Sequence, residues 1–302
     1  MENQTAKHFA LQLGSLGSLY LSLSFLLVLI FGIINLAFPD AAAGAWEAES
    51  AAGSVRIGIA IVVVFFPTYI YLTRIVNQNR RQNSDNHYLS LTKWLIYLSL
   101  VVGGAVLLGD LVAVMISFLE GDITQRFVLK ALAVLVVIGG AFYYYAKDAK
   151  GYWVQNEKQS IIFATLMSVI VLTSVIVGFM QIPTPTEYRS QKLDQTQLND
   201  LQSIQWRIEE HIATNGNLPE NLEALYQNQS QVLPTAPENR DEYSYEVTET
   251  GFELCATFSK SSEQDSYYSR PYTKEFETPT IINPDNWNYA EGRYCFERVV
   301  KY

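Results

Sequence analysis

The sequence predicts an α-helical membrane bundle of five transmembrane helices, followed by a small extracytoplasmic α+β domain. The chain has 302 residues, of which 49% are hydrophobic and only 17% are charged. That charged fraction is below the level of about a quarter that is usual in soluble domains. Five long apolar runs lie before residue 183, and a bilayer is crossed by a helix of about 20 such residues. The residues after 183 lack such runs, so this half of the chain is predicted to be soluble.

The charges divide the chain at the same place. Residues 1–182 contain 11 Lys and Arg against 10 Asp and Glu, whereas residues 183–302 contain 10 against 20. We therefore expect a near-neutral membrane domain over 1–182, a Pro-containing linker over 183–193 and an acidic domain over 194–302. The acidic half argues against nucleic acid as a partner, because phosphate binding requires a basic surface.

The first two spans are expected at residues 16–38 and 57–76. The first run is longer than the core of a typical signal peptide, and only Lys7 precedes it as a positive charge, so an uncleaved span is the preferred interpretation. A signal peptide cleaved in the alanine-rich segment that follows is the alternative. Pro67 lies in the middle of the second run and predicts a helix kink, because proline removes a backbone hydrogen bond.

The next two spans form a helical hairpin. Residues 95–119 and 125–146 are joined by the short polar segment 120–124, which requires the two helices to lie antiparallel. The fifth span is expected at residues 160–182.

The loops predict the orientation of the bundle. Seven Lys and Arg lie between residues 74 and 93 and between residues 147 and 158, and such loops normally stay in the cytoplasm. With five spans, the N-terminus is then cytoplasmic and the C-terminal domain extracytoplasmic. The expected location is a bacterial cytoplasmic (inner) membrane, with the lipid bilayer as the first partner.

The soluble half predicts an amphipathic helix packed on an antiparallel sheet. Apolar residues recur every three or four positions over residues 194–214. Alternating segments at 243–247 and 252–258, and a last one near 293–300, are typical of strands. The helical apolar positions are Leu198, Leu201, Ile204, Ile208 and Ile212.

Cys255 and Cys295 are the only cysteines. Each is out of phase with the apolar residues of its predicted strand, so both can lie on one face of the sheet. In an oxidising compartment this favours a disulfide, and closing a loop of about forty residues stabilises a domain by roughly 3–4 kcal/mol in the chain-entropy model. A redox or nucleophilic pair is the alternative interpretation.

Asp110 lies inside the third span. A charge in the bilayer core costs about 2.5 kcal/mol or more, so it is usually partnered. We expect an intramembrane polar pair of Asp110 with Lys130 or Arg126 across the hairpin. Proton or ion translocation centred on Asp110 is the alternative.

No catalytic constellation, phosphate loop or dinucleotide fingerprint is present in the sequence. The histidines His8, His87 and His211 lack metal-ligand spacing. We therefore expect no enzyme, no metal and no cofactor, and favour a non-enzymatic, membrane-anchored interaction or sensing module. A small transporter or proton-coupled protein centred on Asp110 is the second hypothesis.

The polar and aromatic segment 259–292 is a possible contact loop for a protein partner, because exposed aromatic residues are typical of recognition surfaces. A loop that merely covers the domain is the alternative, and small-residue stripes such as Gly14, Ser18 and Ser22 permit a homo-oligomer without requiring one. The aromatic residues of the loop are Tyr267, Tyr268, Tyr272, Trp287 and Tyr289.

Two resemblances add to this interpretation. The stretches VRIGIAIVVVFFPT (55–68), KWLIYL (93–98) and LGDLVAVMISFLEGDITQRFVLK (108–130) resemble an uncharacterised four-helix membrane domain of unknown function from candidate-phylum bacteria. This resemblance implies no known activity.

The stretch DLQSIQWRIEEHIATNGNLPENLEAL (200–225), with the hairpin at 243–258, resembles the soluble domain of type IV pilins and type II secretion pseudopilins. It implies pilus or secretion components as partners. The chain departs from that family in lacking a processed Gly-Phe-type motif before a span, and Pro183 and Pro185 separate the last span from the helix.

Overall fold

The computed structural model of the chain describes residues 2–39, 45–82, 86–121, 124–227, 232–262, 281–282 and 286–300. The chain forms two compact units, and the change from one to the other falls between Ile182 and Pro183. The expected fold class is confirmed: long apolar helices precede a small antiparallel sheet. We call residues 1–182 the membrane unit and residues 183–302 the outer unit, the second name following the orientation expected from the sequence.

The helices of the membrane unit are longer than the apolar runs that identified them. Five helices in the described part of the chain are long and apolar enough to cross a membrane, which supports membrane association. The short α5 lies between the last two of them. The elements are α1 (Glu2–Ala37), α2 (Ala45–Gln82), α3 (Asn86–Glu120), α4 (Gln125–Ala149), α5 (Tyr152–Gln155) and α6 (Glu157–Gln181).

Helix α2 continues through Pro67, so this proline does not end the helix. The next residue, Thr68, donates its hydroxyl to the carbonyl of Val64 at 2.8 Å. Whether the helix bends at Pro67 stays a prediction.

Helices α1 and α2 approach each other closely at two glycines. A Cβ atom at Gly58 would lie 2.7 Å from Cβ of Leu29, and a Cβ at Gly32 would lie 2.7 Å from the side chain of Val55. Leu29 and Val55 are fully buried. Helix α6 joins at the same level, because a Cβ at Gly178 would lie 3.0 Å from Leu29. We call the contact of Gly32, Gly58 and Gly178 with Leu29 and Val55 the glycine junction.

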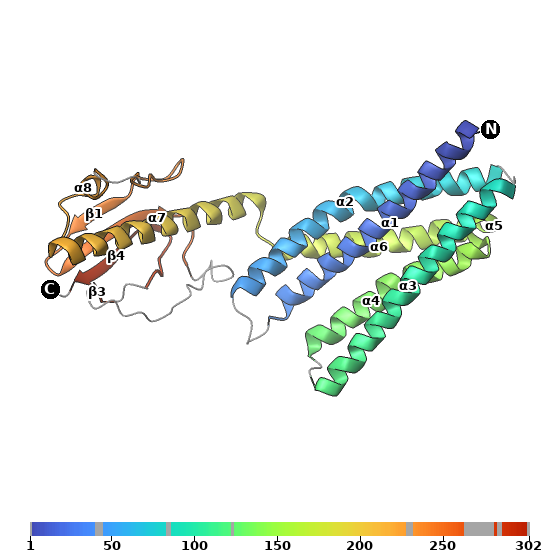
Figure 1. Cartoon of the computed structure of the whole chain (residues 1–302), viewed down its shortest axis with the longest axis horizontal. Helices are drawn as coiled ribbons and strands as arrows, with labels where there is room; N and C mark the ends of the chain where they lie inside the picture. The colour runs from blue at the N-terminus through green and yellow to red at the C-terminus, as the bar shows by residue number, and fades with distance from the viewer. Residues whose placement is uncertain are drawn as a thin grey trace. The chain divides into compact units, whose positions relative to one another are not determined.

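Helices α3 and α4 form the expected hairpin and lie side by side (Figure 1). Gly121 turns the chain with a φ of +76°, a conformation that glycine adopts without strain. Thr124 caps α4 by accepting a hydrogen bond from the Phe127 N–H at 3.2 Å. Many apolar side chains of α3 are exposed, Leu108 and Leu119 among them, as expected for a helix that faces lipid.

The outer unit is one long helix on an antiparallel sheet of order β1-β2-β4-β3. The helix begins at Pro185, inside the segment expected to be a linker. Proline suits the first turn of a helix, and Thr184 and Glu187 form a capping box there. The elements are α7 (Pro185–Asn215), α8 (Leu222–Tyr226), β1 (Ser244–Val247), β2 (Gly251–Phe258), β3 (Ile281–Ile282) and β4 (Gly292–Val300).

The core of the outer unit lies between α7 and the sheet. Leu201, Ile204 and Ile208 present the predicted apolar face, and they belong to one buried cluster with Phe252 and Leu254 of β2. Figure 1 shows α7 running along the strands. Burial of each such side chain stabilises the fold by about 1.5–3 kcal/mol.

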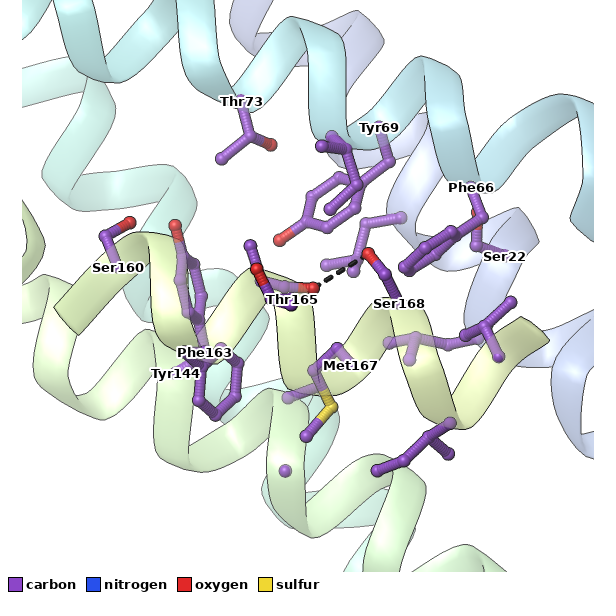
Figure 2. Close-up of a pocket in the computed structure, with 18 of the residues that line it drawn as sticks. Ser22, Phe66, Tyr69, Thr73, Tyr144, Ser160, Phe163, Thr165, Met167 and Ser168 are labelled. Carbon is purple, nitrogen blue, oxygen red and sulfur yellow. Dashed lines mark hydrogen bonds between the residues drawn. The ribbon is translucent and has the colours of Figure 1, made fainter. Parts of the chain in front are cut away.

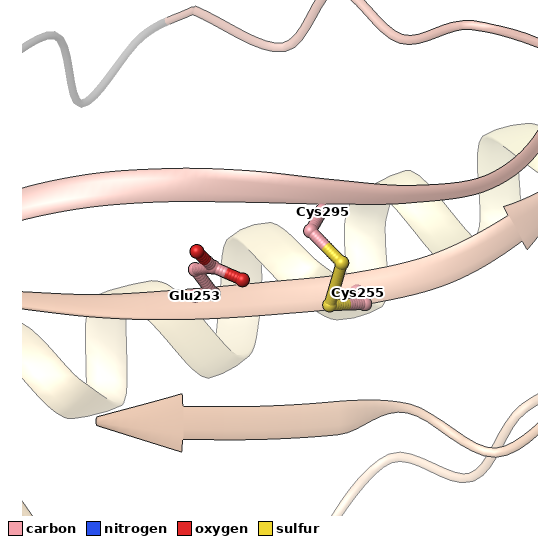
Figure 3. A group of neighbouring side chains, drawn as sticks. All are labelled: Glu253, Cys255 and Cys295. Atoms are coloured by element: carbon pink, nitrogen blue, oxygen red, sulfur yellow. A yellow bond between two sulfur atoms is a disulfide. The ribbon is translucent and has the colours of Figure 1, made fainter. Parts of the chain in front are cut away.

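The structure contains the expected disulfide between Cys255 and Cys295 (Figure 3). The two residues are direct partners in the β2–β4 ladder. Their neighbours Leu254 and Phe296 are buried in the core cluster. Because side chains alternate along a strand, the disulfide lies on the opposite face of the sheet.

Replacing Gly58 by Ala tests the glycine junction. The added methyl would collide with Leu29, including its backbone, so Gly58→Ala should lower the free energy of unfolding by about 1–3 kcal/mol. Gly109→Ala on α3 is the matched control, because nothing lies within 4 Å of its Cβ position and Ala favours a helix by up to about 1 kcal/mol. Thermal denaturation of the full-length protein in detergent measures both; equal melting temperatures would contradict the junction.

Removing the disulfide should destabilise the outer unit. The two cysteines are 40 residues apart, so the double replacement Cys255→Ala with Cys295→Ala should lower its free energy of unfolding by about 4 kcal/mol. Pulse proteolysis in a urea series follows the cleavage of residues 183–302 separately from the membrane unit. An unchanged urea midpoint, with and without reducing agent, would show that the disulfide adds no stability.

Candidate functional site

The membrane unit contains an elongated cavity of about 380 Å³ between four helices. Its lining comes from α1, α2, α4 and α6, and none of it comes from α3. Figure 2 shows the side chains of these helices converging on the cavity. The volume lies within the range of about 300–1,000 Å³ that is typical of small-molecule sites.

Most of the cavity wall is apolar. Leucines of α1 face the aliphatic and aromatic side chains of α2, and α4 and α6 supply small and branched residues. Such a wall binds hydrocarbon by removing it from water or by replacing lipid contacts. Its members include Leu23, Leu26, Phe66, Ile70, Val137 and Ala164.

The glycine junction closes one end of the cavity. Leu26 and Val62 line the cavity. Leu26 lies one helical turn before Leu29, and Val62 lies one turn after Gly58. A Cβ at Gly178 would lie 3.0 Å from Leu29 and 3.2 Å from Ile59, so α1, α2 and α6 pack closely at this level. The cavity therefore has a blind apolar end.

The opposite end is polar and includes Arg74, Asn77, Arg81, Glu157 and Ser160. Arg81 is held by three groups, two from α5 and one from the first residue of α6. It forms an ion pair with Glu157 at 2.8 Å and donates to the backbone carbonyls of Val154 and Trp153, both at 3.2 Å. We call this polar end the mouth of the cavity.

A buried ion pair supports the mouth from behind. Arg80 donates to Asp148 at 2.9 Å, and the side chains are 14% and 7% exposed. Tyr144 stacks on Trp153 with ring centroids 5.1 Å apart, and the Trp153 indole N–H donates to the Tyr144 carbonyl at 2.8 Å. These contacts connect α2, α4 and α5 at the polar end of the cavity.

Three hydroxyl groups of the cavity lining are bonded to the backbone of their own helices. Thr165 donates to the carbonyl of Ile161 at 2.9 Å, and Ser168 donates to the carbonyl of Ala164 at 2.8 Å. Ser22 donates in the same way to Ser18 at 2.6 Å. Because each hydroxyl already donates its hydrogen bond to the backbone, these side chains add little polarity to the wall seen in Figure 2.

The structure does not bring together the polar pair predicted in the hairpin. Arg126 pairs with Glu47 at 2.9 Å and donates to the Asn35 carbonyl at 3.1 Å, whereas Lys130 lies over the Phe31 ring, 5.9 Å from its centroid. Among the described residues no ion pair reaches Asp110. Positions along the hairpin do not indicate which side of α4 faces a neighbour, and Arg126 and Lys130 face α2 and α1.

The predicted contact loop needs a correction at two residues. Trp287 and Tyr289 are buried in the core of the outer unit, 6% and 5% exposed. Tyr289 stacks on Phe258 at 3.9 Å, and the Arg298 guanidinium lies 4.5 Å from the Trp287 ring. They are core residues and not a contact surface. The other three residues of that prediction, Tyr267, Tyr268 and Tyr272, lie outside the described residues.

Buried polar contacts in the outer unit hold its helix to its loops. Asp194 is fully buried, forms an ion pair with Arg240 at 2.6 Å and accepts from the Ser259 N–H at 2.9 Å. Tyr243 donates to Asp200 at 2.6 Å, and burial together with that carboxylate raises the pKa of Tyr243 above its ordinary value. Sequence patterns did not indicate these pairings, because their members are far apart in the chain.

Three potential metal ligands, Glu253, Cys255 and Cys295, lie close together (Figure 3). Both sulfur atoms belong to the disulfide, and metals bind cysteine as the thiolate. This group is therefore a structural cross-link beside a carboxylate and not a metal centre.

Comparison with protein families matches residues 8–145 to a domain of unknown function (DUF5671). The match covers α1 to α4 apart from the ends, which is 138 of 302 residues and less than half of the chain. No curated protein and no solved structure matches the chain. The match agrees with an uncharacterised membrane domain, and the likeness of the outer unit to pilins stays a prediction.

Two conservative substitutions distinguish the aspartates of the membrane unit. Asp148→Asn removes the charge that neutralises buried Arg80, so it should lower the free energy of unfolding by about 3 kcal/mol or more. Asp110→Asn should leave the free energy of unfolding unchanged, because no ion pair of the described residues is lost. Melting of both variants in detergent measures this. A loss in Asp110→Asn that Lys130→Met restores would establish the hairpin pair instead.

Proposed function

We propose that this protein is a non-enzymatic, membrane-anchored binding module whose ligand is an amphiphilic small molecule held in the helix bundle. The observation that carries the proposal is the cavity, apolar and closed at the glycine junction and charged at its mouth. A ligand with a hydrocarbon body and a polar head matches both parts of the wall. A purely polar solute would match only the mouth.

The length of the cavity fits a molecule that lies along the membrane normal. On α6 the lining extends from Glu157 to Val171, and 14 helical steps of 1.5 Å span about 21 Å. One leaflet of a bilayer has a hydrocarbon depth of about 15 Å, half of the total. An acyl chain of ordinary length therefore fits between the mouth and the blind end.

The contacts of the lining side chains support binding without catalysis. The hydroxyls of Thr165 and Ser168 donate to backbone carbonyls, so neither is paired with a base that would make it a nucleophile. Asp148 and Glu157 are in ion pairs with Arg80 and Arg81. Among the described lining residues we find no nucleophile and base within hydrogen-bond reach.

Transport centred on Asp110 is the weaker hypothesis. Asp110 lies on α3, which contributes nothing to the cavity. A substrate in the cavity would therefore not meet this carboxylate. Its position gives the transporter hypothesis no support beyond the residue itself.

The proposed orientation places the outer unit outside the cytoplasm of a bacterial cell. The Lys and Arg of the loops gather at the end of the bundle that holds the mouth, which favours a cytoplasmic mouth. The disulfide agrees with an oxidising environment for the outer unit. In this arrangement, the acidic outer unit is presented to a protein partner on the far side of the membrane.

A tryptophan in the cavity should abolish ligand binding. Ala164 lines the cavity, so Ala164→Trp should fill it and remove at least about nine-tenths of any amphiphile that co-purifies, because a blocked pocket cannot repack around a chain. Ile162→Trp is the matched control on the same helix, since Ile162 is exposed and lies outside the lining. Mass spectrometry of organic extracts from purified full-length protein measures both. Equal extracts from the two variants would reject the proposal.

A further inference from the structure

We propose that the ligand is an anionic phospholipid whose phosphate is bound by Arg74 at the mouth of the cavity. This inference rests on the proposed function and adds the chemical class of the ligand. It is carried by the placement of one arginine whose contacts differ from those of Arg80, Arg81 and Arg126.

Arg74 lines the cavity and is exposed. Within the part of the chain that the structure describes, no acidic residue forms an ion pair with it. Arg80, Arg81 and Arg126 differ from it, because each forms an ion pair with a carboxylate. Arg74 therefore retains its full set of donors for a ligand, and a guanidinium binds a phosphate through two parallel hydrogen bonds.

The helix face that contains Arg74 changes from apolar to charged along the cavity. Ile70, Arg74, Asn77 and Arg81 all line it, and their spacing of three or four residues places them on one face of α2. Arg74 is also the first charged residue of the apolar run 57–76, and it lies near the end of that run. A side chain at this depth reaches the headgroup level of a bilayer while its methylene groups stay in hydrocarbon.

The charge around the mouth favours an anionic head over a zwitterionic one. The acidic residues of α4 and α6 at this end, Asp148 and Glu157, are neutralised by Arg80 and Arg81. The basic residues Lys147, Lys150 and Lys158 belong to the same end of these helices and the turn between them. This excess of positive charge attracts the negative charge of a phosphatidylglycerol and repels the ammonium group of a phosphatidylcholine.

A fatty acid or an isolated phosphate meets only part of this site. A carboxylate would satisfy Arg74 with the same single negative charge, but it offers fewer acceptor oxygens than a phosphodiester with its glycerol. Inorganic phosphate would satisfy Arg74 and leave the apolar cavity unused. A phospholipid with one acyl chain in the cavity uses the guanidinium, the basic surroundings and the length of the cavity together.

Lipid retention by the full-length protein tests the assignment. The protein is reconstituted into vesicles of equal phosphatidylglycerol and phosphatidylcholine, extracted in detergent, and its bound lipid is quantified by mass spectrometry. The wild-type protein should retain phosphatidylglycerol about tenfold over phosphatidylcholine, and Arg74→Gln should reduce that retention about tenfold, as expected for the loss of a charged hydrogen-bond pair. Lys158→Gln removes one charge at the same end outside the lining and should leave retention almost unchanged.

The other outcomes are distinct. Equal retention of the two lipids, unaltered in Arg74→Gln, would overturn the headgroup assignment while the cavity still bound chains. Displacement of the lipid by an excess of inorganic phosphate would assign the site to free phosphate and overturn the phospholipid. No retained lipid in the wild-type protein would reject the proposed function itself. Should Arg74→Gln fail to elute as a folded protein, Arg74→Lys, which keeps the charge but loses the paired hydrogen bonds, should show a several-fold loss of retention.

Discussion

The glycine junction is the contact on which the membrane unit depends. Because Gly32 and Gly58 have no side chains, the backbones of α1 and α2 approach until Leu29 and Val55 are fully buried. Without a strong hydrophobic force between helices in lipid, such close van der Waals packing drives their association. Gly178 brings α6 to the same point. Three helices that touch at one level must then diverge to either side, and the cavity is the space that opens toward the mouth.

At the opposite end of the bundle, large aromatic side chains keep the helices apart, and polar bonds connect them. The stacked rings of Tyr144 and Trp153, with Phe163 5.6 Å from the Tyr144 ring, are too large to allow the helices to close. The Arg80–Asp148 pair and the bonds of Arg81 connect the same helices across this width. Polar bonds are strong in a low-dielectric setting when both partners are satisfied. The cavity therefore lies between a blind end made by small residues and a mouth made by large and charged ones.

The sequence was sufficient for the elements and insufficient for their contacts. Hydropathy located five spans because length and apolar content alone decide whether a helix can cross a bilayer, and strand phase indicated the Cys255–Cys295 pair. Helix packing order is not encoded in either signal, so the pairing of Arg126 with Glu47 and the cavity could not be foreseen. In the sequence, Arg80 and Arg81 count only among the charges that predict the orientation of the bundle. Trp287 and Tyr289 are two positions apart, with one residue between them, and this strand-like alternation indicates that both face the core.

The central claim is that the cavity of the membrane unit is a lipid site with its head at Arg74. The most direct measurement is an electron cryo-microscopy structure of the full-length protein in a nanodisc that contains anionic phospholipid. The claim predicts a continuous, elongated non-protein density between α1, α2, α4 and α6, ending at the glycine junction and beginning within hydrogen-bond distance of the Arg74 guanidinium. A cavity filled by repacked side chains, or lipid density confined to the outer surfaces of α3 and α4, would contradict it.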